Sequence, residues 1–249
     1  MAQLIPFPDG GFAFLKGGFA YSQGVKALEG HAIERVRFAR PLPLLHGFAA
    51  IEAHLAALGR PRTALCAAEL RSPQPLTMAG FRTFNEGYVG VLTKWNLFRD
   101  GLNPVARSNV APRIAPPAEP CFYAFCYSVP AAAAVNFVAA GSGEWPEGGR
   151  FPEDIVARGD VTPAGLRQKV RFVLGKMEER LAGLGASWGD ATAVQVYSVH
   201  DIHGVLREEI LPRTGNGPGV TWHYCSPPIV ELEYEMDVRG VALERVLAV

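Results

Sequence analysis

The same helical pattern occurs twice in this chain, and the repeat limits the folds that the chain can adopt. In the first half, apolar residues recur at spacings of 4, 3, 4 and 3, which is typical of an amphipathic helix: Leu44, Phe48, Ile51, Leu55 and Leu58. The same spacings return 126 residues later: Val170, Leu174, Met177, Leu181 and Leu184. Glycine follows each run, and glycine readily ends a helix in the left-handed conformation. Two copies of one structural unit are therefore predicted.

Strand-like segments surround both predicted helices in the same order. Each helix is followed by a strand, a shorter helix and a closing strand: 64–70, 81–98 and 121–129 in the first half; 193–199, 202–211 and 229–238 in the second. We therefore predict an α+β fold with two tandem domains, 1–130 and 135–249, each a mostly antiparallel sheet covered by helices on one face. The linker is expected near residues 130–134.

Composition excludes several classes of protein. With 249 residues, 49% hydrophobic and 19% charged, the chain can bury a sizeable core. Its formal net charge is zero, which removes the electrostatic reason to expect a nucleic-acid or membrane partner. The N-terminus does not resemble a signal peptide, and no apolar run reaches the roughly 18 residues that span a bilayer. The four cysteines form no Cys-x-x-Cys pair, so we expect free thiols in a cytoplasmic protein.

Short motifs occur in the order in which one known family carries them. The first half has Asn-Glu-Gly-Tyr at residues 85–88 and Pro-Val-Ala-Arg-Ser at residues 104–108. The second half has Gly-Ser-Gly at residues 141–143 and Asp-Ala-Thr-Ala-Val-Gln-Val-Tyr at residues 190–197. In this order the motifs resemble the Rid (YjgF-like) family, whose domains have a chorismate-mutase-like fold. The tandem layout is similar to that of the 2-aminomuconate and 2-amino-5-chloromuconate deaminases of aromatic degradation.

The resemblance implies a function as well as a fold. It implies a cofactor-independent hydrolytic deaminase that acts on an enamine or imine carboxylic acid, such as a 2-aminomuconate-type diacid, and releases ammonia. In that family an arginine binds the substrate carboxylate and a glutamate helps water to attack the C=N carbon. The family forms trimers, so a homotrimer is expected. Two alternatives stay open: a chorismatase-like enzyme, and a non-catalytic homologue that binds a small ligand.

The two halves keep different parts of this machinery. The first half has Arg107, whose planar guanidinium suits a carboxylate, but its last predicted strand carries no glutamate. The last predicted strand of the second half alternates Glu231, Glu233 and Glu235, but the segment that corresponds to the arginine motif, residues 218–223, has no arginine. Three carboxylates on one face repel one another, so at least one should be protonated or paired with a cation.

Two explanations fit this complementary loss: one composite site, or a site rebuilt from new residues. We expect the composite site, with Arg107 as the carboxylate ligand and a glutamate of the second half as the group that activates water. Glu233 is the first candidate because it is central in its predicted strand, and Glu231 is the second.

Other polar residues are candidate substrate contacts. Tyr21 and Ser22 lie near the segment that corresponds to the family's early Ser-Gly-Gln strand end, where side chains face the substrate. Asn85 either contacts the substrate or only packs its helix, and His223 is a further candidate contact. His200 and His203 are three residues apart, and His223 lies near Cys225. No third metal ligand is identifiable from the spacing, so we expect no metal site.

Overall fold

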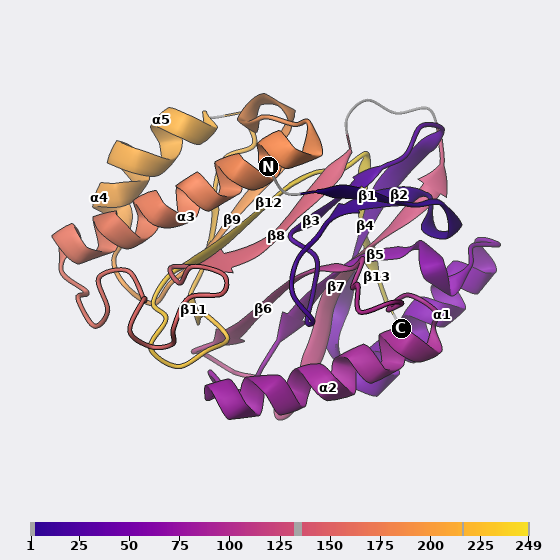
Figure 1. Cartoon of the computed structure of the whole chain (residues 1–249), viewed down its shortest axis with the longest axis horizontal. Helices are drawn as coiled ribbons and strands as arrows, with labels where there is room; N and C mark the ends of the chain where they lie inside the picture. The colour runs from indigo at the N-terminus through magenta and orange to yellow at the C-terminus, as the bar shows by residue number, and fades with distance from the viewer. Residues whose placement is uncertain (1–2, 132–135, 216, 249) are drawn as a thin grey trace.

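The computed structural model describes residues 3–131, 136–215 and 217–248, which form two β-sheets with helices on their outer faces (Figure 1). One sheet is covered by α1 (Leu44–Ala57) and α2 (Met78–Lys94). The other is covered by α3 (Pro163–Leu184), α4 (His203–Val205) and α5 (Leu211–Thr214), with a π-helical turn at Leu206–Ile210 between the last two. Within the described ranges, no helix has the length and apolar character needed to cross a membrane.

The predicted internal repeat is confirmed by the strand order of the two sheets. The first half contributes β4 (His31–Pro43), β5 (Leu65–Arg71), β6 (Ala106–Pro112) and β7 (Cys121–Pro130), in the spatial order β4-β7-β5-β6. The second half contributes β8 (Phe137–Gly143), β9 (Ala193–Tyr197), β10 (Thr221–His223) and β12 (Glu235–Gly240), in the spatial order β8-β12-β9-β10. In both halves the second and third strands in chain order, β5 with β6 and β9 with β10, are parallel to each other. The fourth strand, β7 or β12, is antiparallel to both of its neighbours. α1 and α3 therefore occupy equivalent positions.

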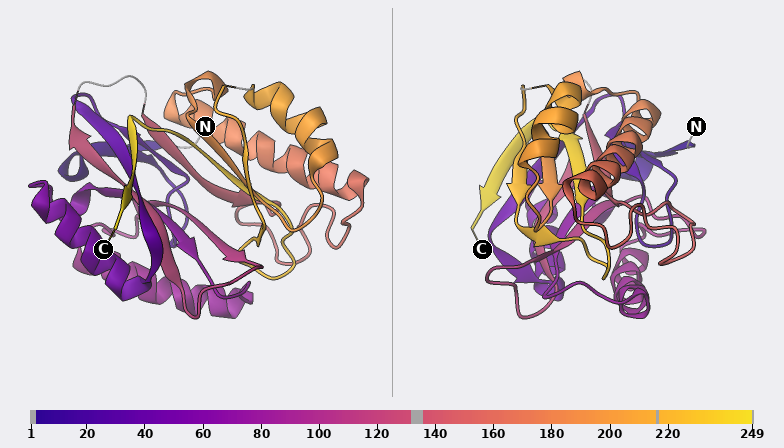
Figure 2. Two further views of the ribbon diagram at one scale, coloured as in Figure 1. Left: turned by 180° about the vertical axis from the view of Figure 1, so that it is seen from behind. Right: turned by 90° about the vertical axis from the view of Figure 1, so that its left-hand side faces the viewer.

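The remaining strands exchange between the halves. The N-terminal strands β1 (Leu4–Phe7), β2 (Phe12–Leu15) and β3 (Gly24–Ala27) extend the second sheet, because β3 pairs with β8. Conversely, β13 (Leu243–Leu247) lies parallel to β4, and β11 (Cys225–Ser226) pairs with β6. The left view of Figure 2 shows the yellow C-terminal strand beside the dark violet strand β4 of the first half.

A division of the chain at 1–130 and 135–249 therefore does not separate the two sheets. The repeat defines only the four strands that each half contributes, and the open sheet edges pair with strands from the other half. Of the predicted linker near residues 130–134, residues 132–134 lie outside the described residues.

The inner faces of the sheets are polar, and they face each other. In β12, Met236 and Val238 pack in the apolar core under α3, whereas Asp237 and Arg239 alternate with them and point inward. Arg239 reaches Glu69 of β5 at 4.0 Å, so an ion pair links the two sheets. The interior between the sheets thus contains charged side chains from both halves, and the helices cover the apolar faces.

Candidate active site

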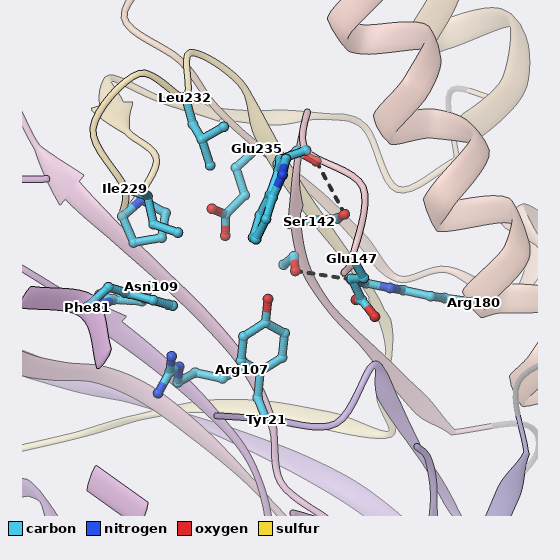
Figure 3. Close-up of a pocket in the computed structure, with 14 residues that line it drawn as sticks. Tyr21, Phe81, Arg107, Asn109, Ser142, Glu147, Arg180, Ile229, Leu232 and Glu235 are labelled. Atoms are coloured by element: carbon cyan, nitrogen blue, oxygen red, sulfur yellow. Dashed lines mark hydrogen bonds and ion pairs between the residues drawn. The ribbon is translucent and has the colours of Figure 1, made fainter. Parts of the chain in front are cut away.

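A cavity lies where β6, β8 and the start of β12 meet between the sheets. Its volume is about 90 Å³, and we call it the inner cavity. Its charged and polar lining combines both halves of the chain (Figure 3): Tyr21, Arg107, Asn109, Ser142, Glu147, Arg180 and Glu235. A second cavity of about 650 Å³, the outer cavity, shares Tyr21, Phe81, Trp145 and Glu147 with it.

Arg107 is buried beside the inner cavity, and no described residue accepts a hydrogen bond from either terminal nitrogen of its guanidinium group. The side chain is on β6, and the residue is only 3% exposed. Neither of its terminal nitrogens, Nη1 and Nη2, has a hydrogen-bond partner among the described residues. Burial lowers the pKa of Arg107, although a guanidinium stays protonated at neutral pH. A buried cation with free N–H groups is costly unless an anion binds it.

Aromatic rings form the surroundings of this cation. The guanidinium carbon lies 4.9 Å from the ring centroid of Tyr88, 5.2 Å from that of Tyr21, 5.6 Å from Phe84 and 5.7 Å from Phe81. Three of these rings recur along one face of α2 at helical spacing, so the helix places them together over β6. The rings partly stabilise the charge through cation–π contacts and exclude water from it.

Asn109 supplies a second donor on the same face of β6. It is two residues beyond Arg107, so both side chains leave the strand in the same direction. Its Oδ1 accepts a hydrogen bond from the Ser72 hydroxyl at 3.0 Å, which leaves the Nδ2 group toward the cavity without a partner among the described residues. Arg107 and Asn109 together therefore offer several N–H donors to a carboxylate.

Glu235, the first residue of β12, places a buried carboxyl group across the cavity. Figure 3 shows this carboxyl group and the Tyr21 hydroxyl pointing toward the middle of the cavity. Glu235 is 4% exposed, and burial, with the charge of Asp237, raises its pKa to about 8, against the lowering effect of nearby arginines. Gly141 leaves the space that this carboxyl group occupies, because a Cβ there would overlap Glu235 Oε1. Such a group can exchange a proton near neutral pH.

A buried ion pair fixes the segment that leads into Glu235. Glu144 accepts the backbone N–H of Glu233 at 2.6 Å and that of Tyr234 at 3.1 Å. The Lys169 ammonium lies 3.2 Å from the same carboxylate, and both side chains are fully buried. Burial raises the pKa of Glu144, although Lys169 and the two N–H groups act in the opposite direction. The Glu144 carboxylate thus accepts hydrogen bonds from two backbone N–H groups, those of Glu233 and Tyr234, that would otherwise bond to a neighbouring strand.

A second arginine, Arg180 of α3, also lines the inner cavity, but both of its terminal nitrogens have partners. Nη1 donates to the carbonyl oxygens of Ala140 at 2.7 Å and Gly141 at 3.0 Å. Nη2 lies 2.7 Å from Glu147, whose other carboxylate oxygen accepts from Gln23 at 2.7 Å. Arg180 therefore anchors the end of β8 and is neutralised by Glu147, in contrast to Arg107.

An apolar loop closes the inner cavity. Ile229 and Leu232 line it and pack with Phe81 and Trp145, which also line it. Leu76 holds the loop, because its N–H donates to the Pro228 carbonyl at 2.8 Å and its carbonyl accepts from Val230 at 3.0 Å. A water-poor cover of this kind strengthens every electrostatic interaction inside.

The two glutamates predicted as catalytic lie elsewhere. Glu231 sits in a turn at positive φ (78°) and is ion-paired with Arg158. Glu233 is bound to His200 at 2.6 Å, and neither carboxylate lines the inner or the outer cavity. The predicted strand over 229–238 is wrong in its first part, because β12 begins only at Glu235. The N–H groups of residues 233 and 234 bind the Glu144 carboxylate instead of a strand.

The predicted substrate contacts fall into two groups. Tyr21 lines both cavities, and Asn85, which is buried with no hydrogen-bond partner for Oδ1 among the described residues, lines the outer one. Ser22 and His223 line neither cavity. The Ser22 hydroxyl donates to the Pro104 carbonyl at 3.2 Å and so supports the segment before Arg107.

His223 belongs to a separate cluster on β9 and β10. Its ring stacks on Tyr197 with centroids 5.0 Å apart, and Nε2 lies 3.2 Å from the Gln195 side-chain oxygen. Burial, together with nearby Arg71, lowers its pKa to about 4. Of the other histidines considered, His203 is bound to Asp201 at 2.6 Å. In the described parts of the chain, no three or more His, Cys, Asp or Glu side chains converge on a point that could hold a metal ion.

Comparisons with known proteins identify the family of the chain. Residues 4–245 match the family described as 2-aminomuconate deaminase CnbZ. A 2-amino-5-chloromuconate deaminase from Comamonas testosteroni is 45% identical over 252 residues, covering 99% of this chain and 100% of that protein. The crystal structure of a chorismatase superposes with a TM-score of 0.54 at 13% identity, over 96% of this chain and 86% of that one, which shows a shared fold. By the family match over nearly its whole length, and by its identity to that deaminase, the chain belongs to the 2-aminomuconate deaminase family.

Proposed function

We propose that this protein is a cofactor-independent hydrolytic deaminase of a 2-aminomuconate-type enamine diacid and releases ammonia. The observation that carries the proposal is the pairing, in one cavity, of two buried groups. One is the Arg107 guanidinium, whose terminal nitrogens have no partner among the described residues, and the other is the Glu235 carboxyl group, whose pKa is about 8. The first matches a substrate carboxylate, and the second matches the proton transfers of deamination. The name of the 45% identical relative supports the same substrate class.

Arg107 and Asn109 bind and orient the substrate. The carboxylate next to the amino-bearing carbon takes the free N–H groups of both side chains. Because these groups lie beside the cavity that Glu235 lines, the bound carboxylate holds the adjacent C–N carbon within reach of the Glu235 carboxyl.

Glu235 moves the protons of the reaction. In its protonated form it gives a proton to the enamine carbon, and the C–N group becomes an electrophilic iminium. The resulting carboxylate takes a proton from water while the water oxygen bonds to the iminium carbon. Glu235 then passes this proton to nitrogen, the C–N bond breaks, and ammonia leaves. The hydroxyl left on carbon gives its proton to the Glu235 carboxylate, which restores the protonated form of Glu235. In sum, enamine and water become a 2-oxo acid and ammonia.

Substitution of three glutamates tests the proposal. Glu235→Gln should lower kcat for ammonia release from 2-aminomuconate by roughly 10²-fold or more, because the amide cannot exchange the proton. Glu233→Gln and Glu231→Gln should keep most of the activity, since neither carboxylate lines a cavity. If Glu233→Gln is inactive and Glu235→Gln active, the assignment to Glu235 is wrong. If the wild-type protein releases no ammonia, or turns over chorismate instead, the proposed function is wrong.

A second substitution tests the carboxylate ligand. Arg107→Met removes the donor fork but fills a similar volume beside the same rings. It should raise KM by about tenfold or more, as expected for loss of a charged hydrogen bond. Glu235→Gln should leave KM much closer to that of the wild type, so the two variants separate binding from turnover.

We also propose that the chains assemble as homotrimers in the cytoplasm. The Rid resemblance supports the trimer, and the exposed apolar side chains Leu45, Ile114 and Val246 offer contact area. Cys66, Cys121, Cys126 and Cys225 are free thiols, as suits a reducing compartment. Light scattering that gives a monodisperse particle of 26.9 kDa would contradict the trimer.

A further inference from the structure

The inner cavity is too small for a six-carbon diacid. Ligand pockets typically have volumes of about 300–1,000 Å³, whereas the inner cavity has about 90 Å³ and the adjoining outer cavity about 650 Å³. If one carboxylate binds Arg107, the rest of an extended substrate must pass between the shared side chains of Tyr21, Phe81 and Trp145 into the outer cavity. The second carboxylate then lies in the outer cavity.

A second carboxylate needs a second cation, and Arg180 does not provide it. Both terminal nitrogens of Arg180 already donate to two carbonyl groups and Glu147. Glu147 also lines the outer cavity, and its negative charge opposes an anion there unless Arg180 continues to neutralise it.

Arg82 is the available cation of the outer cavity. It is the only positively charged side chain among the described residues that line this cavity, and it makes no ion pair with any described residue. It lies in the second turn of α2, one residue after Phe81, which separates the two cavities. Its charge is therefore free to meet a carboxylate that emerges beside Phe81.

Asn85, one helical turn further along α2, adds an independent polar group. It is 4% exposed, lines the outer cavity, and has no hydrogen-bond partner for its side-chain oxygen among the described residues. A buried amide without a partner is rare in folded proteins and is satisfied by a ligand or water. This oxygen can accept a hydrogen bond from a water molecule that bridges to the carboxylate.

We propose that the outer cavity is the binding site for the second carboxylate of the substrate, with Arg82 as its cationic ligand and Asn85 as a polar neighbour. The enzyme then selects dicarboxylates over monocarboxylates at a site separate from the reacting centre. This inference rests on the proposed function for the identity of the substrate, but it can be tested by binding alone.

Two unreactive probes separate the carboxylates: muconate, a six-carbon diene with two carboxylates, and sorbate, a six-carbon diene with one. Isothermal titration calorimetry would compare the wild type with Arg82→Met, Arg82→Lys and the control Lys94→Met, which removes an exposed cation at the far end of α2. We expect Arg82→Met to weaken muconate binding by about five- to tenfold, a partly exposed charge pair being worth less than a buried one. Sorbate binding should change less than about twofold, and Arg82→Lys should recover part of the muconate affinity.

The outcomes distinguish this inference from the proposed function. Equal effects of Arg82→Met on muconate and sorbate, or no effect on muconate, overturn the second-carboxylate site even if the wild type releases ammonia. A selective loss of muconate affinity supports the site even if no ammonia is released, in which case only the proposed reaction is wrong. A loss of the same size in Lys94→Met would show a general charge effect and would also overturn the proposal.

Discussion

The buried pair of Glu144 and Lys169 offers the sharpest test of how the fold positions Glu235. In Glu144→Gln the shape of the side chain is kept but its charge is lost. The Lys169 ammonium then stays fully buried without a carboxylate beside it, and it keeps its hydrogen bond to the Val156 carbonyl at 3.2 Å. The amide also has one oxygen where the carboxylate has two, so the N–H of either Glu233 or Tyr234 loses its acceptor.

The expected loss of stability is large for a single substitution. Removing one partner of a buried ion pair costs about 3–5 kcal/mol, and for a chain of this length that lowers Tm by roughly 6–20 °C. We also expect kcat to fall in conditions where the variant is still folded, because the segment before Glu235 loses its anchor.

Equilibrium urea unfolding of a double-mutant cycle measures the pair. Lys169→Met should also destabilise the protein, and the double variant should lose less free energy of unfolding than the sum of the single losses, because no uncompensated buried charge remains. The control is Asp154→Asn in the exposed ion pair with Arg150, which should leave the unfolding midpoint close to that of the wild type. If Glu144→Gln unfolds at the same midpoint as this control, the reasoning about Glu144 fails.

Three further predictions concern the site. The pKa of Glu235 is raised from 4.5 to about 8, so between these pH values the folded state keeps a proton that the unfolded state has lost. The stability of the wild type relative to Glu235→Gln should therefore fall as the pH rises from about 4.5 to about 8. A parallel pH dependence in both proteins would count against the raised pKa. Gly141→Ala should lower kcat at least tenfold while unfolding near the wild-type midpoint, since its Cβ displaces the flexible Glu235 carboxyl; Gly175→Ala, with no atom within 4 Å of its added Cβ, is the matched control. Treatment with a metal chelator should leave ammonia release unchanged, because the proposed steps use only Arg107, Asn109 and Glu235; activity lost with the chelator and restored by zinc would refute this.

The sequence predicted those features that local patterns encode. The matched spacing of α1 and α3 depends only on helical periodicity, and the structure places the two helices at equivalent positions. The complementary loss of arginine and glutamate pointed to a meeting of the two halves, and Arg107 and Glu235 do line one cavity. Arg180 was missed, although an arginine on the apolar stripe of a helix, between Met177 and Leu184, is a sign of a buried partner.

The choice of glutamate could not be made from the sequence. The central position of Glu233 in the predicted strand favoured this residue, but the start of β12 depends on Glu144, which is 89 residues away from Glu233 along the chain. No local pattern reveals a bond of that range. The exchange of edge strands could not be predicted from the sequence either, because an edge strand of suitable sequence can pair with either sheet.

Because strands are exchanged between the halves, this chain can complete its fold only late in its synthesis. The strands β1, β2 and β3 leave the ribosome long before β8, with which β3 pairs. Likewise, β4 has no edge partner until β13 is synthesised, since Leu243 of β13 pairs with Glu34, 209 positions earlier. Until translation is nearly complete, the nascent chain exposes unpaired strand edges, the surfaces through which incomplete chains aggregate. For the same reason a gene split between the repeats would encode two fragments that each lack an edge strand.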